Sequence, residues 1–562
     1  MPTGSVAPET TAAVPGPGPE HVVEIEGLTF QYRRGSSPAI EDLSLTIDAG
    51  EVLLVAGPSG CGKSTLIRAI NGLIPHAYPG ELKGSVKVAG RETTEQKLRD
   101  ISLVVGTVLQ DPARQIVGAT VESELAFGPE NLGIDRAEIR TRIHEVSAAA
   151  SIDTLLGRET AALSGGERQL LAMAGILMLR PRLYVVDEPL ANLDPATAAR
   201  LLAILRRLAD EGHAIVIVEH RVEEVLELAP EKVLYLDGGR TRYLGDVAGF
   251  LDVADPDAVK LPFEVTARRL RALGRPAPPP PPMLGGQVRE DTPDEAPRLE
   301  FRHVRAGYRT GEVLHGIDAK LGAREVVAVL GPNGSGKTTL FRTAMRLLDI
   351  DEGEILVDRV TTADTSVAQL ATVFGYVFQS PSQMLFARTV REELEFGPRN
   401  LGRDPAAFAT IVEDALRRTS LDQLDDILER PPLTLSFGQQ KRLALAIALA
   451  LQPKTLILDE PSAGQDHQTA TAFMHEVLSI PGLESIYLVT HDVDLALTHS
   501  DRILLFRSGA VVADGRPGHV IEDEDRWRSC NLRVTSLMRA NAKRRVRDGR
   551  FLGADALAAE EQ

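Results

Sequence analysis

The chain has 562 residues, of which 43% are hydrophobic and 25% charged, a balance typical of globular protein. Its 79 acidic and 62 basic side chains give a net charge of −17, which disfavours nucleic acid as a partner because a phosphate backbone would be repelled. Two cysteines, Cys61 and Cys530, supply no disulfide framework, and no apolar run reaches the roughly 18 residues of a membrane-spanning helix. We therefore expect a soluble protein of a reducing compartment.

From the N-terminus, residues 1–20 are rich in Pro, Gly, Thr and Ala and lack the basic start and apolar core of a secretory signal, so a disordered tail is expected. The chain beyond it is an internal repeat. Lys63, Asp187 and His220 recur as Lys337, Asp459 and His491, at an offset that stays between 271 and 274 residues. Such constant spacing predicts two homologous domains.

We place these domains at 21–274 and 297–525. The segment 275–296 between them contains RPAPPPPP, and five consecutive prolines favour an extended spacer. The last segment, 526–562, is interpreted as a basic tail, because 526–550 contains nine basic residues and one acidic residue. It either stays solvated or contacts an anionic membrane surface.

In each copy a buried strand, 51–56 or 324–330, leads into a glycine loop of the form GxxxxGK[ST]. Glycines let backbone N–H groups turn toward phosphate, and the following helix presents its positive end to the same anion. The lysine is expected to reach the terminal phosphates and the Ser or Thr hydroxyl to hold Mg²⁺. The predicted ATP-binding residues are Gly57, Gly60, Gly62, Lys63, Ser64 and Thr65, and Gly331, Gly334, Gly336, Lys337, Thr338 and Thr339.

A second buried strand in each copy, 182–186 or 455–458, ends in Asp-Glu. Alternating strands and helices predict an α/β fold with a mainly parallel sheet, whose carboxyl edge is where ligands bind. Asp187 and Asp459 are expected to help hold Mg²⁺. Glu188 and Glu460 follow directly and are the candidate general bases for the attacking water.

LSGGE (163–167) and LSFGQ (435–439), which lie between the two phosphate motifs of each copy, resemble the signature of ABC-type ATPases. The resemblance covers nearly the whole chain. It implies that each domain adds an antiparallel β subdomain and a helical signature subdomain, and that the cassettes pair head to tail around two ATPs. Each ATP then meets the phosphate loop of one cassette and the signature of the other, namely Ser436, Phe437 and Gly438 for site one, and Ser164, Gly165 and Gly166 for site two.

The same resemblance assigns further roles. Gln110 and Gln379 match the glutamine that senses Mg²⁺ and water, and His220 and His491 match the switch histidine. The adenine-stacking aromatics would be Tyr32 and Tyr308, and Asp194 and Asp466 match the loop that communicates between sites. Phe437 departs from the pattern, since glycine stands there in the first copy; we expect site one, built around Lys63, to work at a different rate.

The segments that follow Gln110 and Gln379 share TVxxEL and FGPxNLG at the same spacing. This form resembles the ATPases of energy-coupling-factor importers, which take up vitamins and cobalt or nickel ions. The resemblance implies a protein peripheral to the cytoplasmic face of the membrane, with an integral coupling subunit and a substrate-binding membrane subunit as partners. Candidate walls of the docking surface are Val117, Leu125, Phe386 and Phe396, and candidate charges are Glu122, Glu124 and Glu393.

Two other classes stay open. One is a soluble ABC protein outside transport, such as a ribosome-associated translation factor, although such factors join their cassettes by a charged helical linker. The other is a fused ATPase of a different ABC importer, in many of which one site lacks its catalytic glutamate. The substrate is bound by another subunit, so no residue of this chain encodes it.

Overall fold

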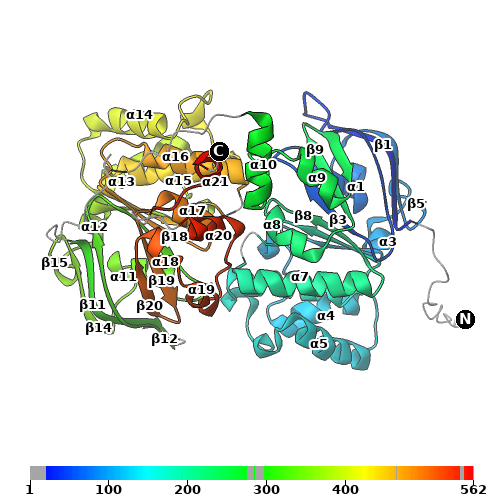
Figure 1. Cartoon of the computed structure of the whole chain (residues 1–562), viewed down its shortest axis with the longest axis horizontal. Coiled ribbons are helices and arrows are strands. Elements are labelled where there is room, and N and C mark those ends of the chain that lie inside the picture. Colours follow the sequence, from blue (N-terminus) through cyan, green and yellow to red (C-terminus); the bar gives the residue numbers. More distant parts are fainter. Residues whose placement is uncertain are drawn as a thin grey trace, which may run out of the picture.

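The computed structural model describes residues 21–190, 193–274, 284, 297–309, 311–463, 465–544 and 550–560. Figure 1 shows two similar bodies side by side, the N-terminal one in blue to green and the C-terminal one in green through yellow to red. The predicted tail 1–20 lies outside the described residues, as does the predicted linker 275–296 apart from Leu284.

Each cassette is built on a six-stranded sheet whose inner strands are parallel and whose last strand is antiparallel. All five residues of β3 and of β8 are buried, as expected of strands covered on both faces. In the first cassette the spatial order is β10 (Arg240–Gly245), β9 (Lys232–Asp237), β3 (Val52–Ala56), β8 (Ala214–Val218), β7 (Leu183–Asp187) and β6 (Val105–Val108). In the second it is β20 (Ala510–Gly515), β19 (Arg502–Arg507), β13 (Val326–Leu330), β18 (Ser485–Thr490), β17 (Thr455–Asp459) and β16 (Phe374–Val377).

A separate four-stranded antiparallel sheet lies beside each of these, and the two sheets of a cassette share one hydrophobic cluster with the helix after the phosphate loop. That helix is α1 (Lys63–Ile70) or α11 (Lys337–Ala344). The strands are β2 (Ile40–Ile47), β1 (Val23–Tyr32), β4 (Gly80–Val88) and β5 (Arg91–Glu92), and β12 (Gly311–Gly322), β11 (Pro297–Tyr308), β14 (Glu352–Val357) and β15 (Val360–Thr361). The predicted α/β fold, with two sheets in each cassette, is confirmed.

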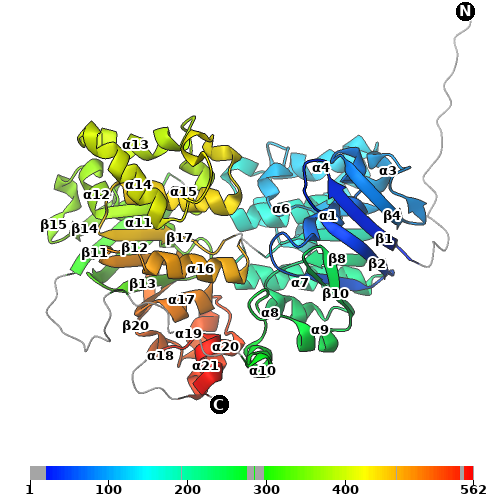
Figure 2. The same ribbon diagram turned by 90° about the horizontal axis from the view of Figure 1, so that it is seen from above.

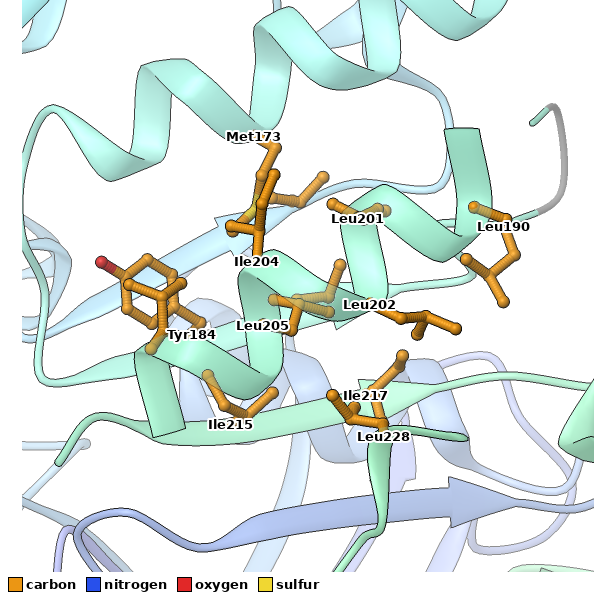
Figure 3. Close-up of a cluster of buried hydrophobic side chains, with 14 of the residues drawn as sticks. Met173, Tyr184, Leu190, Leu201, Leu202, Ile204, Leu205, Ile215, Ile217 and Leu228 are labelled. Atoms are coloured by element: carbon orange, nitrogen blue, oxygen red, sulfur yellow. The ribbon is translucent and has the colours of Figure 1, made fainter. Parts of the chain in front are cut away.

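Helices cover the other face of the parallel sheet. Figure 3 shows the side chains of Leu201 and Leu205 from α7 packed with Ile215 and Ile217 of β8 and with Met173. Burying each such side chain contributes roughly 1.5–3 kcal/mol. The helices on this side are α6 (Gly165–Leu177) and α7 (Pro195–Asp210), and α15 (Phe437–Ala450) and α16 (His467–Leu478). α4 (Val121–Asn131) and α5 (Arg136–Ala150) pack on α6, and α13 (Val390–Asn400) and α14 (Phe408–Arg418) pack on α15.

Shorter helices complete the described chain. They are α2 (Leu73–His76), α3 (Leu98–Ser102), α8 (Val222–Val225), α9 (Val247–Val253), α12 (Val367–Val373), α17 (Val493–His499) and α18 (Pro517–Val520). Over the described ranges, none of the helices is long and apolar enough to cross a membrane.

The C-terminal segment corrects the prediction of a basic tail from 526 onward. It carries α19 (Glu524–Ser529), α20 (Ser536–Lys543) and α21 (Ala554–Glu560), and Trp527 is fully buried. Its basic residues alternate with apolar ones, so the charges face outward while the apolar face packs. α10 (Phe263–Leu273), at the end of the first cassette, packs against α20 and α21 (Figures 1 and 2), so this segment joins the two cassettes.

Candidate functional site

The two phosphate loops have the same geometry. A Cβ at Gly57 would lie 2.2 Å from the carbonyl oxygen of Leu236, and the backbone there has φ of 149°, so only glycine fits. Lys63 is 5% exposed, and its ammonium donates hydrogen bonds of 2.8 Å to the carbonyls of Gly57 and Pro58. The loop thus holds a buried cation at the N-terminus of α1, an arrangement suited to phosphate.

In the second cassette Lys337 donates in the same way to Gly331, at 2.7 Å, and to Pro332, at 2.9 Å. α11 begins at Lys337, as α1 begins at Lys63. The other predicted glycines, Gly60, Gly62, Gly334 and Gly336, all have φ between 76° and 108°. Thr65 and Thr339 are buried at the start of their helices, and Ser64 is exposed.

The Asp of each Asp-Glu pair ends its strand beside the phosphate loop. Asp459 Oδ1 accepts a 3.3 Å hydrogen bond from Thr338, and Oδ2 accepts one of 2.9 Å from the Tyr376 hydroxyl. Burial and the charge of Glu460 raise the pKa of Asp459 to about 6. Burial and Glu188 raise that of Asp187 to about 6 as well. A buried carboxylate beside a hydroxyl suits Mg²⁺, because both groups offer the oxygen ligands that the ion prefers and its positive charge would stabilise the ionised carboxylate.

Glu188 and Glu460 both occupy left-handed backbone conformations, with φ of 47° and 51°, which directs their side chains away from the strand. In site one, Gln110 Nε2 donates to Glu188 Oε2 at 2.6 Å, and His220 Nε2 lies 2.8 Å from Glu188 Oε1. The structure therefore brings the three predicted residues of site one together.

Site two is arranged differently. His491 Nδ1 lies 2.9 Å from Glu460 Oε2, and the same oxygen accepts hydrogen bonds from the Thr490 hydroxyl, at 3.1 Å, and from the His491 backbone N–H, at 3.3 Å. Gln379 makes no hydrogen bond to Glu460, although both side chains belong to the described chain. Burial opposes ionisation of Glu460, but His491 and Lys337 outweigh it and lower its pKa.

The residue before each switch histidine explains the difference. In the first copy it is Glu219, whose buried carboxylate accepts the backbone N–H of His220 at 2.9 Å and that of Leu190 at 2.9 Å. In the second copy it is Thr490, which has no carboxylate, so Glu460 accepts the backbone N–H itself. A catalytic carboxylate that is committed to the backbone is less free to turn toward a glutamine.

The signature serines cap their helices. The Ser164 hydroxyl accepts the Glu167 N–H at 3.3 Å while Glu167 accepts the Ser164 N–H at 2.7 Å, and Ser436 forms the same capping box with Gln439. Added Cβ atoms at Gly165 and Gly438 would meet no atom within 4 Å. Backbone N–H groups at both helix starts are thus sterically accessible to an anion.

Two contacts show that the cassettes face each other head to tail. A Cβ on Gly166 would lie 3.7 Å from Asn333 Nδ2 in the phosphate loop of the other cassette. Reciprocally, the Ser59 N–H in the first phosphate loop donates to Asp466 Oδ2 at 3.3 Å. Phe437 is 46% exposed, with the Lys441 ammonium 5.3 Å from its ring centroid.

The two predicted adenine-stacking tyrosines have unlike surroundings. Tyr32 is bound on the phosphate-loop side, since its hydroxyl lies 3.1 Å from Thr65 Oγ1 and accepts a 2.7 Å hydrogen bond from Arg68. Tyr308 is 42% exposed, and a single 3.4 Å hydrogen bond from Arg342 reaches its hydroxyl. Tyr308 is therefore the more exposed of the two side chains.

Sequence reasoning missed several residues of the site. Besides Glu219 and Tyr376, it missed Lys441, which is buried and donates to the carbonyls of Pro461, at 2.6 Å, and Ala463, at 2.7 Å. Burial lowers the pKa of Lys441 to about 7. A difference between the two copies could have pointed to these residues. Glu219 aligns with Thr490, Tyr376 with Thr107, and Lys441 with Gln169, so in each pair only one copy has the functional side chain.

The docking surface needs two corrections. Glu124 accepts the N–H groups of Val117 and Gly118 at 2.8 and 2.6 Å, and Glu393 does the same for Phe386 and Ala387, so neither carboxylate faces outward. Leu125 is fully buried and belongs to the core. The exposed apolar side chains are Val117 (62%), Phe127 (51%), Phe386 (65%) and Phe396 (47%), and Glu122 is exposed beside them.

Comparison with known proteins shows the family of the chain. The chain matches the ABC transporter family over residues 40–191 and 314–463. An ABC transporter ATP-binding protein of Methanosarcina mazei is 34% identical over 89% of this chain and 90% of its own length. One of Lactobacillus johnsonii is 31% identical over 92% and 94%. The solved structure of CbiO1 from Clostridium perfringens, described as part of the ABC transporter complex CbiONQ, shares 32% identity over 45% of this chain and all of its own, with a TM-score of 0.38. The chain belongs to the ABC transporter family and is an ABC transporter ATPase with two cassettes in one polypeptide.

Proposed function

We propose that this ATPase energises an energy-coupling-factor type importer of a micronutrient, which is a vitamin, a vitamin precursor or a cobalt or nickel ion. Its partners are an integral membrane coupling subunit and a substrate-binding membrane subunit, and its place is the cytoplasmic face of the cell membrane. The observation that carries the proposal is the repeated QxP…FGPxNLG segment, which presents exposed apolar side chains in both cassettes.

Within each ATPase domain, 21–274 and 297–525, the phosphate loop binds ATP. The lysine leaves its carbonyl partners for the terminal phosphates, and the hydroxyl of Ser64 or Thr338 and the carboxylate of Asp187 or Asp459 hold Mg²⁺. When bound, Mg²⁺ offsets phosphate charge and orients the terminal phosphate. The signature helix of the opposite cassette directs its N-terminus at the same phosphate.

Glu188 and Glu460 accept the proton of the attacking water. In site one the 2.8 Å contact with His220 and the 2.6 Å hydrogen bond from Gln110 hold the carboxylate on two sides. A positioned general base contributes roughly 10²–10⁴-fold to the rate. In site two Glu460 has no contact with Gln379, so its carboxylate is held by His491 and Thr490 instead.

Coupling to the membrane follows from the place of Gln110. Gln110 contacts Glu188 of site one and begins the segment 110–133, and the exposed Val117 and Phe127 lie further along the same segment. An apolar helix of the coupling subunit that docks on these side chains buries them, in the manner of a helix in a groove. In the second cassette Phe386 and Phe396 pack edge to face, 4.8 Å between centroids, and form the equivalent surface.

A pull-down from membranes tests the proposal. The wild-type protein should retain a polytopic membrane protein, and the variant Val117→Asp/Phe386→Asp should lose it, because burying two carboxylates in an apolar groove is unfavourable. Val360→Asp is the matched control, since Val360 is 56% exposed and lies on β15, outside this surface. Recovery of ribosomes without an integral membrane protein contradicts the transporter and favours the translation-factor class.

A further inference from the structure

Lys260 lies between α9 and α10 of the first cassette, outside every motif of the ATP sites. Its backbone nevertheless supports the switch segment. The Lys260 N–H donates to the carbonyl of His220 at 3.2 Å, and the Glu223 N–H donates to the Lys260 carbonyl at 3.2 Å. The two hydrogen bonds attach Lys260 to both sides of the turn that follows His220, so that a displacement of this turn displaces Lys260.

The side chain of Lys260 crosses into the second cassette. Its ammonium lies 2.8 Å from Asp494 Oδ2 and 3.6 Å from Asp492 Oδ1. Asp492 directly follows His491 and accepts the Leu495 N–H at 3.2 Å, which caps α17. Lys260 therefore contacts two equivalent segments. Its backbone contacts the segment around His220 of site one, and its side chain contacts the segment that follows His491 of site two.

The charges around Lys260 favour this crossing. Its side chain is 21% exposed. Burial disfavours its charge, but Asp492, Asp494 and Glu223 outweigh burial and raise its pKa. Burial likewise disfavours ionised Asp492, yet Lys260 and the capping N–H lower the pKa of Asp492 to about 2. Asp494 is buried and Lys260 partly so, and such a pair is costly to break on one side only, so the two segments are held together.

The surroundings place this pair between the two catalytic centres. A cavity of about 80 Å³ has Lys260 in its wall together with Glu188 and His220 of site one and His491 and Asp492 of site two. The C-terminal helices fix both ends of the connection. The Thr535 hydroxyl donates to Asp494 at 2.5 Å, and the Ser536 N–H donates to Glu223 at 2.9 Å.

We propose that Lys260 is a positioning residue that couples the two ATP sites, by transmitting the position of the His220 turn to Asp492 and, through it, to His491. The proposal rests on the catalytic roles proposed above for Glu188 and Glu460. When ATP binding moves the His220 turn in site one, the Lys260 backbone follows and its ammonium moves the start of α17 beside site two. The same connection runs in the opposite direction.

The test measures how strongly one site depends on the other. Glu460→Gln removes the base of site two, so the remaining ATPase rate reports site one. In the coupled protein this rate should fall below about a tenth of the parent rate, whereas with independent sites the rates of Glu460→Gln and Glu188→Gln would add up to the parent rate. Adding Lys260→Met, which keeps the length but removes the charge, should raise the remaining fraction at least threefold. Lys260→Arg should leave it low.

Lys232→Met is the matched control, because Lys232 has an ion pair of the same 2.8 Å length, with Glu51, inside the first cassette. It should not change the remaining fraction. Asp494→Asn tests the same contact from the other side and keeps an acceptor for Thr535, so the proposal stays testable if Lys260→Met folds poorly. Thermal unfolding of every variant shows which of them are folded.

Three results overturn the proposal: rates of Glu188→Gln and Glu460→Gln that add up to the parent rate, a remaining fraction that stays unchanged in both Lys260→Met and Asp494→Asn, or a Lys232→Met variant that produces the same rise. The double variant Glu188→Gln/Glu460→Gln separates failure of the proposal from failure of the catalytic assignment. If that variant still hydrolyses ATP, the assignment of the two bases is wrong. If it is inactive and the remaining fraction does not respond to Lys260, the coupling alone is wrong.

Discussion

Replacing Asp459 by Asn should stabilise the protein in the absence of nucleotide. Asp459 is 6% exposed, and burial and Glu460 raise its pKa from 3.8 to about 6. A carboxyl whose pKa is higher in the folded state than in the unfolded state binds protons more tightly when folded. Above pH 6 it must ionise in the fold at a cost, whereas below pH 4 it is protonated in both states and costs nothing.

The pKa values give the magnitude. A rise from 3.8 to about 6 corresponds to an upper limit of about 3 kcal/mol at pH 7, at 1.36 kcal/mol for each pH unit. Asparagine keeps one acceptor oxygen, for either Thr338 or Tyr376, and its amide N–H can donate to the other hydroxyl, so little else is lost. For a domain of this size, each kcal/mol moves the midpoint of thermal unfolding by roughly 2–4 °C.

The assay is thermal unfolding without nucleotide between pH 4 and pH 8, with Asp349→Asn, an exposed carboxyl of the same cassette, as control. The gain from Asp459→Asn should be largest at pH 7–8 and should disappear as the pH falls through 6 toward 4. With Mg²⁺ and ATP the order should reverse, because only the wild type keeps the metal ligand. An equal or lower midpoint for Asp459→Asn at pH 7 refutes the reasoning.

Three more predictions concern catalysis and the core. Glu188→Gln and Glu460→Gln together should lower ATPase activity by about 10²-fold or more, and a double variant within about threefold of wild type contradicts this. The two single variants should lose unequal amounts of activity, because Gln110 contacts Glu188 whereas Gln379 does not contact Glu460. Equal rates in the single variants contradict this second statement. Phe437→Gly should change the turnover rate that remains in Glu460→Gln and leave that of Glu188→Gln nearly unchanged, because the proposed pairing of each signature with the opposite phosphate loop assigns Phe437 to site one. Equal effects on the two variants would remove the basis for that assignment. Leu205→Ala should cost about 2–5 kcal/mol of stability, because Leu205 is fully buried, whereas Leu244→Ala, at a position 38% exposed, should cost far less in denaturant unfolding.

The sequence by itself determined the repeat, the α/β fold and the two phosphate loops. These features are local. The phosphate loop is a stretch of nine residues, and its glycines supply the positive φ values that the loop requires. A buried strand is recognised from its run of apolar residues, and Asp187 and Glu188 stand at the end of one such strand. Because the copies keep one offset, each motif of the first cassette located its counterpart in the second.

Tertiary structure decided which groups these side chains contact. Glu124 and Glu393 have the composition of a charged surface, yet they turn inward to backbone N–H groups six and seven residues earlier. The C-terminal basic segment folds because α10, more than 250 residues earlier in sequence, offers it an apolar face. Only the pairing of the cassettes brings Lys260 to Asp492 and Asp494. Local sequence patterns fix the backbone conformation. The partner of a buried charge, by contrast, can lie far away in the sequence, so that only the folded structure identifies it.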